Sequence, residues 1–125
     1  MPESDFKLSQ IGVIMLGVKS VSHSLAFYRD ELGLTVTSEF EGFAFLGTTG
    51  ATLVLSEPLA RARGTTVGAT EVVFSVPDVR AAYEGLRARG VEFDNEPRVV
   101  TGTMWAANFR DPDGHGLSIF GLEHS

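Results

Sequence analysis

The sequence predicts an α+β domain that consists of two tandem βαβββ modules. An apolar segment of strand length is followed by a helical apolar pattern twice, at residues 13–33 and at residues 71–90. Each helical pattern ends at a glycine, and three short strand-like segments separated by turn residues follow each one. A helix covers only one sheet face in such a unit. Two units can therefore bury their open faces on each other or enclose a cleft.

The first module opens with an apolar segment at residues 13–18, which is typical of a strand buried on both faces. Ser20 or Ser22 can cap the following helix, and Gly33 can end it in a left-handed conformation. The apolar helix face consists of Val21, Leu25, Tyr28 and Leu32. Further strands are expected at residues 35–40, 43–46 and 51–56, with turns at 41–42 and 48–50.

The second module repeats this order. Its first strand is expected at residues 71–76, Asp78 is the expected helix cap, and Gly90 is the expected stop. The apolar helix face consists of Val79, Tyr83 and Leu86. Strands are then expected at residues 92–93 extending toward 98, at 104–109 and at 116–120, with a type I turn at 111–114.

The whole chain, residues 1–125, is predicted to be a single domain. It divides into a module at residues 8–57, a linker at 58–69 and a module at 70–123. Because the linker is rich in Ala, Arg, Gly and Thr, we expect a mobile connection.

Composition excludes several classes of protein. Hydrophobic residues make up 43% of the 125 residues, so we expect a folded core rather than disorder. The net charge of −6 and the scattered arginines argue against nucleic acid as a partner. No apolar run is long enough to span a membrane, and no signal peptide pattern is found, which predicts a cytoplasmic protein. The absence of cysteine excludes disulfides and zinc–thiolate sites.

Two motifs resemble the vicinal oxygen chelate superfamily, which includes glyoxalases, bleomycin-resistance proteins and extradiol dioxygenases. The Ser-Leu-Ala-Phe-Tyr and Leu-Gly-Leu sequences at 24–28 and 32–34 look like its opening module. The Asn-Phe-Arg-Asp-Pro-Asp-Gly sequence at 108–114, followed by the strand at 116–120, is similar to its closing hairpin. The resemblance implies an incomplete barrel around a cleft. It also implies a homodimer, often with exchanged modules.

In the metal-using members of that superfamily, four strand positions supply the metal ligands. The resemblance carries these positions onto Val13, Val54, Glu71 and Ser118, where the family has His or Gln, Glu, His and Glu. Only Glu71 could bind a metal, and a catalytic divalent ion needs about three protein ligands. We therefore expect no metal and no other cofactor. A slipped fourth strand would turn Ser56 or Glu57 inward and still leave too few ligands.

Glu71 is the main candidate functional residue, because a charge that opens an otherwise apolar strand is unusual. It could pair with a basic group of a ligand, or it could act as a general base. Alternatively, it marks an exposed strand end, or it forms a salt bridge to Arg98 or Arg110.

Several apolar side chains are expected to line the cleft. Trp105 could stack on a planar ligand, or it could pack in the core or in a dimer interface. Phe43 and Phe45 share one strand face and form either core or cleft wall. The predicted ligand-binding residues are Val13, Met15, Phe43, Phe45, Val54, Ser56, Glu71, Val73, Met104, Trp105 and Ser118. No catalytic role is expected for His23, His115 or His124, although His115 directly precedes the last strand.

Two functional hypotheses follow. In the first, the chain is a metal-free binding module that resembles the antibiotic-resistance members and holds a flat, partly apolar ligand able to carry a positive charge. In the second, it is an enzyme, either a glyoxalase-like lyase or isomerase or a dioxygenase-related enzyme. That enzyme would have an atypical metal site or use Glu71 as its base. A partner-binding subunit with a vestigial cleft is a third reading.

Overall fold

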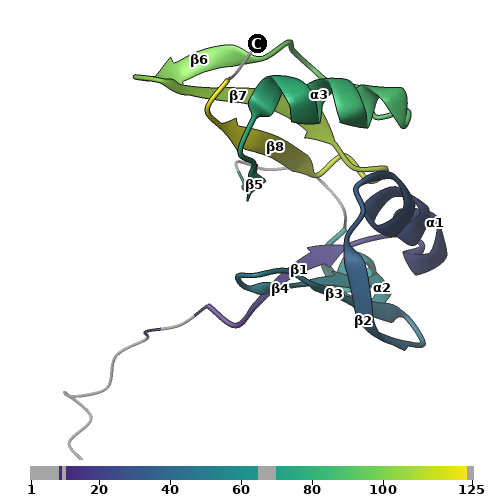
Figure 1. Ribbon diagram of the computed structural model, residues 1–125. Helices are drawn as coiled ribbons and strands as arrows, with labels where there is room; N and C mark the ends of the chain where they lie inside the picture. The colour runs from purple at the N-terminus through teal and green to yellow at the C-terminus, as the bar shows by residue number, and fades with distance from the viewer. Residues whose placement is uncertain (1–8, 10, 65–69, 124–125) are drawn as a thin grey trace, which may run out of the picture.

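The structure is a computed structural model that describes residue 9, residues 11–64 and residues 70–123. Two modules lie one above the other, each with one sheet and one main helical segment (Figure 1). The first module consists of β1 (Val13–Gly17), α1 (Val21–Leu25), the π-helix η2 (Ala26–Glu31), β2 (Thr35–Phe40), β3 (Phe43–Gly47), β4 (Thr52–Ser56) and α2 (Glu57–Arg63). The second consists of β5 (Glu71–Ser75), α3 (Val79–Ala88), β6 (Arg98–Thr101), β7 (Met104–Arg110) and β8 (Gly116–Gly121).

The two sheets have the same topology. The strand order is β1-β4-β3-β2 in the first sheet and β5-β8-β7-β6 in the second. In each sheet the first strand pairs parallel with the last, and the other pairs are antiparallel. Two open four-stranded sheets of this order confirm the predicted tandem βαβββ architecture.

The predicted helix caps and stops are confirmed. Ser20 Oγ accepts a hydrogen bond of 3.2 Å from the His23 N–H, and Asp78 Oδ1 accepts one of 3.2 Å from the Ala81 N–H. Gly33 and Gly90 have φ values of 84° and 100°, which favour glycine because it has no Cβ.

Three elements differ from the prediction. The first helix changes from α to π geometry at Ala26, where the Leu32 N–H donates to the Phe27 carbonyl over 2.9 Å. The expected mobile linker contains the helix α2, because Ser56 caps its first turn and Pro58 fits there without losing a hydrogen bond. The strand expected near residues 92–93 is only an isolated bridge from Phe93 to Phe109, and the paired strand β6 begins at Arg98.

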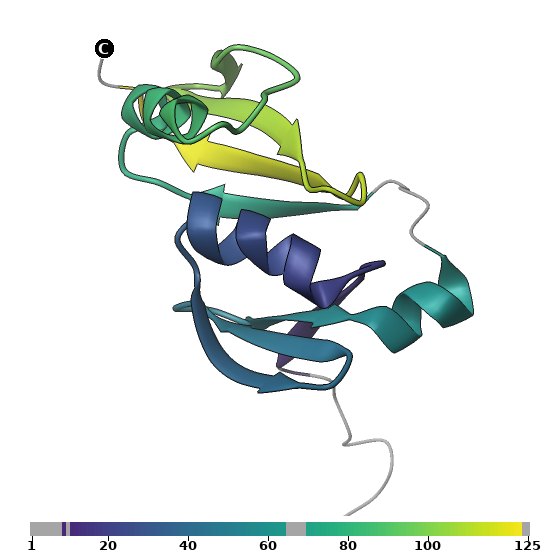
Figure 2. The same cartoon turned by 90° about the vertical axis from the view of Figure 1, so that its right-hand side faces the viewer.

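One hydrophobic core spans both modules. Figure 2 shows α1 and η2 between the two sheets, and α3 covers the second sheet. The ring centroids of Phe27 in η2 and Phe109 in β7 lie 6.4 Å apart, and both side chains belong to this core. The helices α1 and η2 lie between the two sheets. The sheet faces that point away from the helices therefore do not bury each other within one chain.

The predicted turn at residues 111–114 joins the modules through the buried Asp111. Tyr28 Oη donates to Asp111 Oδ2 over 2.7 Å, and the N–H groups of Asp113 and His115 donate to Oδ1 over 3.0 and 2.8 Å. His115 Nε2 lies 2.7 Å from the Gly17 carbonyl oxygen of β1. Burial, together with the adjacent Asp111 charge, raises the pKa of Tyr28 far above its ordinary value, so its hydroxyl remains a donor.

The first strand of each module is an edge strand, so the predicted burial on both faces is wrong. Val13 and Met15 in β1 are 47% and 44% exposed, and Val73 in β5 is 52% exposed. An apolar sequence alone does not show whether a strand is central in its sheet or lies at an edge that another molecule would cover. Among the described residues, no helix is long and apolar enough to cross a membrane.

Candidate functional site

The sheet faces that point away from the helices carry most of the predicted site residues. Met15 and Phe45 both pair with Val54 in the first sheet, and strand alternation places these three side chains on one face. In the second sheet Val73 and Asn108 both pair with Ser118. We call these surfaces the first open face and the second open face. Strand alternation also places Val13, Phe43 and Ser56 on the first open face. It places Glu71, Met104 and Ala106 on the second open face.

The four positions that the resemblance assigned to metal ligands are structurally equivalent in pairs. Val13 and Glu71 each open the first strand of their module. Val54 and Ser118 each pair with the third residue of that strand, Met15 or Val73. Val54 and Ser118 are therefore equivalent to each other in the two modules, and both lie on the open faces.

The first open face is apolar and aromatic. Phe40 is 63% exposed, and its ring contacts Phe45 edge to face at a centroid distance of 6.0 Å. Val54 is fully buried between the strands that carry Met15 and Phe45. These side chains, with the exposed Val13, form an apolar wall that the described chain leaves partly uncovered.

Ser56 and Glu57 both take part in the local structure. Ser56 is buried and its Oγ accepts from the Leu59 N–H at the start of α2 over 3.1 Å, so its role as a ligand-binding hydroxyl stays a prediction. Glu57 Oε2 accepts from the Val21 N–H over 2.8 Å and satisfies an unpaired donor at the start of α1.

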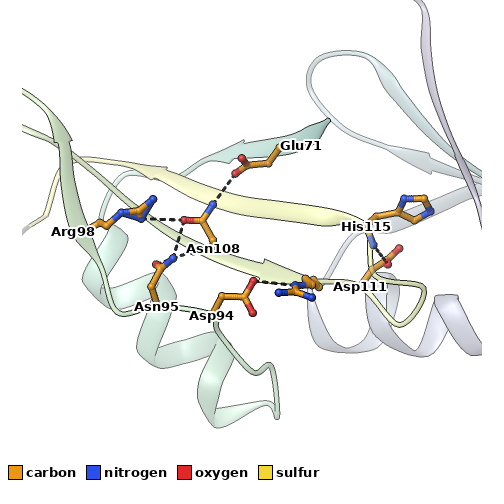
Figure 3. A network of polar contacts seen from close by, with 8 residues as sticks. Glu71, Asp94, Asn95, Arg98, Asn108, Asp111 and His115 are labelled. Atoms are coloured by element: carbon orange, nitrogen blue, oxygen red, sulfur yellow. Dashed lines mark hydrogen bonds and ion pairs between the residues drawn. The ribbon is translucent and has the colours of Figure 1, made fainter. Parts of the chain in front are cut away.

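Glu71 is part of a polar network on the second open face (Figure 3). Its Oε1 accepts a hydrogen bond of 2.9 Å from Asn108 Nδ2. Asn108 Oδ1 in turn accepts from Asn95 Nδ2 at 3.0 Å and from Arg98 Nη1 at 3.3 Å. Asn95 Oδ1 accepts from the backbone N–H of Asn108 over 3.1 Å, which fixes the strand and its side chain together.

This network determines the orientation of the Asn108 amide. Two donors, from Asn95 and Arg98, converge on its oxygen, so its NH₂ group must point toward Glu71. A flipped amide would place its oxygen against the Glu71 carboxylate and its NH₂ against two donors. Asn108 is thus a fixed donor that positions a negative charge on the second open face.

The Glu71 carboxylate is exposed, and no cation of the described chain lies within ion-pair distance of it. Arg98 reaches Asn108 instead, and Arg110 Nε pairs with Asp94 Oδ2 at 3.1 Å. Glu71 is thus exposed at the start of β5, and the predicted salt bridge to Arg98 or Arg110 is wrong, whereas its pairing with a ligand or its action as a base stays a prediction.

Trp105 lies on the other face of the second sheet, so its predicted place in the cleft is wrong. It alternates with Asn108 and Ala106 on β7 and packs against the hydrophobic core. Ala107 and Phe109 share its face and are buried. Met104 is half-buried and keeps the predicted orientation toward the second open face.

The residues at the four candidate ligand positions do not fit a catalytic metal. Two are valines, Ser118 is a weak neutral donor, and the Glu71 carboxylate already accepts from Asn108. The part of the chain that the structure describes contains no group of three or more His, Cys, Asp or Glu side chains able to hold an ion.

The two described histidines lie on α1 and in the turn before β8. His115 is held at the Gly17 carbonyl, and His23 is exposed on α1. His124 lies outside the described residues.

The sequence prediction missed Asn108, the residue that organises the second open face. A signal was present, because Asn108 is a polar residue between the apolar Ala107 and Phe109. Its partner at Glu71 lies 37 positions away, and only the pairing of both strands with β8 brings the two residues together.

Comparisons with known proteins agree with this architecture. The sequence model of the Glyoxalase/Bleomycin resistance protein/Dioxygenase superfamily matches residues 10–119. The uncharacterized protein YraH of Bacillus subtilis (strain 168) is 31% identical over 129 residues, which cover 91% of this chain and 97% of that protein. The chain therefore belongs to the glyoxalase/bleomycin resistance protein/dioxygenase superfamily.

Two solved structures show the same fold. A glyoxalase/bleomycin resistance protein/dioxygenase from Nocardioides has a TM-score of 0.77 and 24% identity, with 96% of this chain and 87% of that chain covered. Lactoylglutathione lyase from Agrobacterium tumefaciens has a TM-score of 0.76 and 20% identity, with 92% and 95% covered. At these identities the likeness concerns the fold alone.

Proposed function

We propose that this protein is a metal-free small-molecule-binding protein of the glyoxalase/bleomycin-resistance type. Its ligand is flat and partly apolar and carries a positive charge. The observation that carries the proposal is the Glu71 carboxylate, which Asn108 holds in place and which has no cationic partner in the described chain. A cation on the ligand would supply the missing partner.

The first open face supplies the apolar half of the proposed site. Phe40, Phe45 and Met15 present aromatic and aliphatic surface to solvent, and a planar ring system gains most from such a wall. One of the four described hollows reaches Val73 of the second open face, and none of the four is lined by residues of both open faces.

We infer that a second copy of the chain completes the groove in a homodimer, with modules exchanged or facing across the interface. The exposed apolar edge strands β1 and β5 support this inference, because uncovered edges of this kind favour association.

A pair of matched probes tests the ligand class. We expect N-methylacridinium to bind with a micromolar Kd in isothermal titration calorimetry, and neutral acridine at pH 8 to bind more weakly. In Glu71→Gln the preference for the cation should fall roughly three- to tenfold, because the glutamine keeps the shape and loses the charge. Light scattering on the same samples measures the oligomeric mass.

Glu84→Gln is the matched control, because Glu84 is an exposed glutamate on α3, away from both open faces. It removes the same charge and should leave the preference unchanged. Equal affinity for both probes, or an equal loss in the two variants, would contradict the proposal. A monomer that binds the cation fully would contradict the groove shared by two chains.

An enzyme that uses Glu71 as a general base is the second candidate function. It is favoured by the free access to the exposed carboxylate, which accepts only the one amide N–H among the described contacts. If a substrate is turned over, Glu71→Gln must abolish the reaction. Full activity of that variant would eliminate the base role.

A further inference from the structure

A hollow lies between the helix α3 and the chain segment that follows η2, and no residue of the first open face lines it. Its volume is about 440 Å³, which falls in the range of small-molecule sites. Phe109 forms part of its buried floor, and the half-buried Phe74 and Leu86 form its walls. Leu32 of the first module closes one side, so the hollow lies on the seam between the modules.

Gly85 lines this hollow on the side of α3. It lies in the middle of α3, and a Cβ built at this position meets no atom within 4 Å. A glycine in the interior of a helix makes the helix less stable than an alanine would. No neighbouring atom lies close enough to require glycine at this position. A side chain at position 85 would therefore extend into open space at the hollow.

Arg89 provides a positive charge at the edge of the hollow. Its Nη1 donates to the Glu31 carbonyl oxygen over 3.1 Å. Because Glu31 belongs to the first module, the guanidinium lies at the contact between the two modules. No carboxylate of the described chain lies within ion-pair distance of it. The remaining guanidinium N–H groups form a planar fork that matches a carboxylate.

We propose that this hollow is a second ligand site, which binds an amphipathic monocarboxylate. The apolar body would lie between α3 and Leu32, on the Phe109 floor, and the carboxylate would meet Arg89. The site is separate from the proposed cation groove, because α3, the segment that follows η2 and strands of the second sheet line it, and no residue of the first open face does. Its ligand would contact both modules and so stabilise their packing.

Sodium octanoate and 1-octanol are the probes, titrated by calorimetry and followed by amide chemical shifts in NMR. Octanoate should bind about tenfold more tightly than octanol, because only octanoate can form an ion pair with Arg89. The largest shift changes should lie at the amides of Leu32, Phe74 and Gly85. Absence of octanoate binding, equal affinity for both probes, or changes confined to the open faces would overturn the proposal.

Three variants sharpen the test. Arg89→Gln should weaken octanoate binding about tenfold and leave octanol unchanged. Gly85→Leu should block both probes while preserving the fold, because leucine is a good helix former and fills the open space. Arg87→Gln is the matched control, because Arg87 stacks on Tyr83 at 5.2 Å and does not line the hollow. A loss in Arg87→Gln equal to that in Arg89→Gln would also overturn the proposal.

Discussion

The two open faces occupy equivalent positions of one repeated framework and differ in chemistry. Phe45 on β3 and Asn108 on β7 each pair with the middle of the last strand of their module, at Val54 and Ser118. At these positions the first module has the Phe45 ring beside the aliphatic Val54. The second module has the Asn108 amide, which holds the Glu71 carboxylate. The strand pairing is conserved between the modules, and the surface that it presents is not.

The difference shows which positions the fold constrains. On the helix-covered side both modules are apolar, because helices and sheets must bury that side to fold. No such requirement applies to the open faces. They can diverge into an apolar wall and an anionic network without disturbing the strands.

The largest expected effect concerns the hydrogen bond between Tyr28 and the buried Asp111, which links the two modules and is called the clamp below. Asp111→Ala should lower the free energy of unfolding by about 3 kcal/mol, because it leaves the Tyr28 hydroxyl and two backbone N–H groups without their acceptor. Urea denaturation measures this change. Asp30→Ala, which removes an exposed carboxylate paired with Arg29, should cause no measurable loss. Equal stability of the two variants would contradict the proposed clamp.

A smaller effect is expected when the second face is made to resemble the first. Asn108→Leu should cost about 1 to 2 kcal/mol of stability, since Asn95 and Arg98 lose their shared acceptor. The same variant should lose the preference for N-methylacridinium over acridine, because Glu71 is no longer held by the amide. Calorimetry that finds the cation preference intact would show that Asn108 does not organise the site.

Much of the fold follows from local signals in the sequence. Ser20 and Asp78 cap their helices as expected, and Gly33 and Gly90 take the left-handed conformation at the helix ends. The helix α2 was missed, because its Ala- and Arg-rich sequence has no wide apolar stripe and it buries no residue completely.

Features of the site that depend on long-range pairing could not be predicted. Trp105 was placed in the cleft because its strand is apolar on both sides, and only the register with β8 assigns it to the core face. The Asn108 network requires β5 and β7 to lie on either side of β8, an arrangement that no local pattern encodes. Glu71 could be found because a lone charge on an apolar strand is a local signal.

Metal content, together with a thermal-shift titration, tests most directly whether the proposed groove works without a metal. Purified protein should contain no stoichiometric metal, and Ni, Zn, Mn and Fe(II) should give no saturable rise in Tm, because one carboxylate cannot hold a catalytic ion. One tightly held ion per chain, with a saturable shift that Glu71→Gln removes, would contradict the account and restore the enzyme reading.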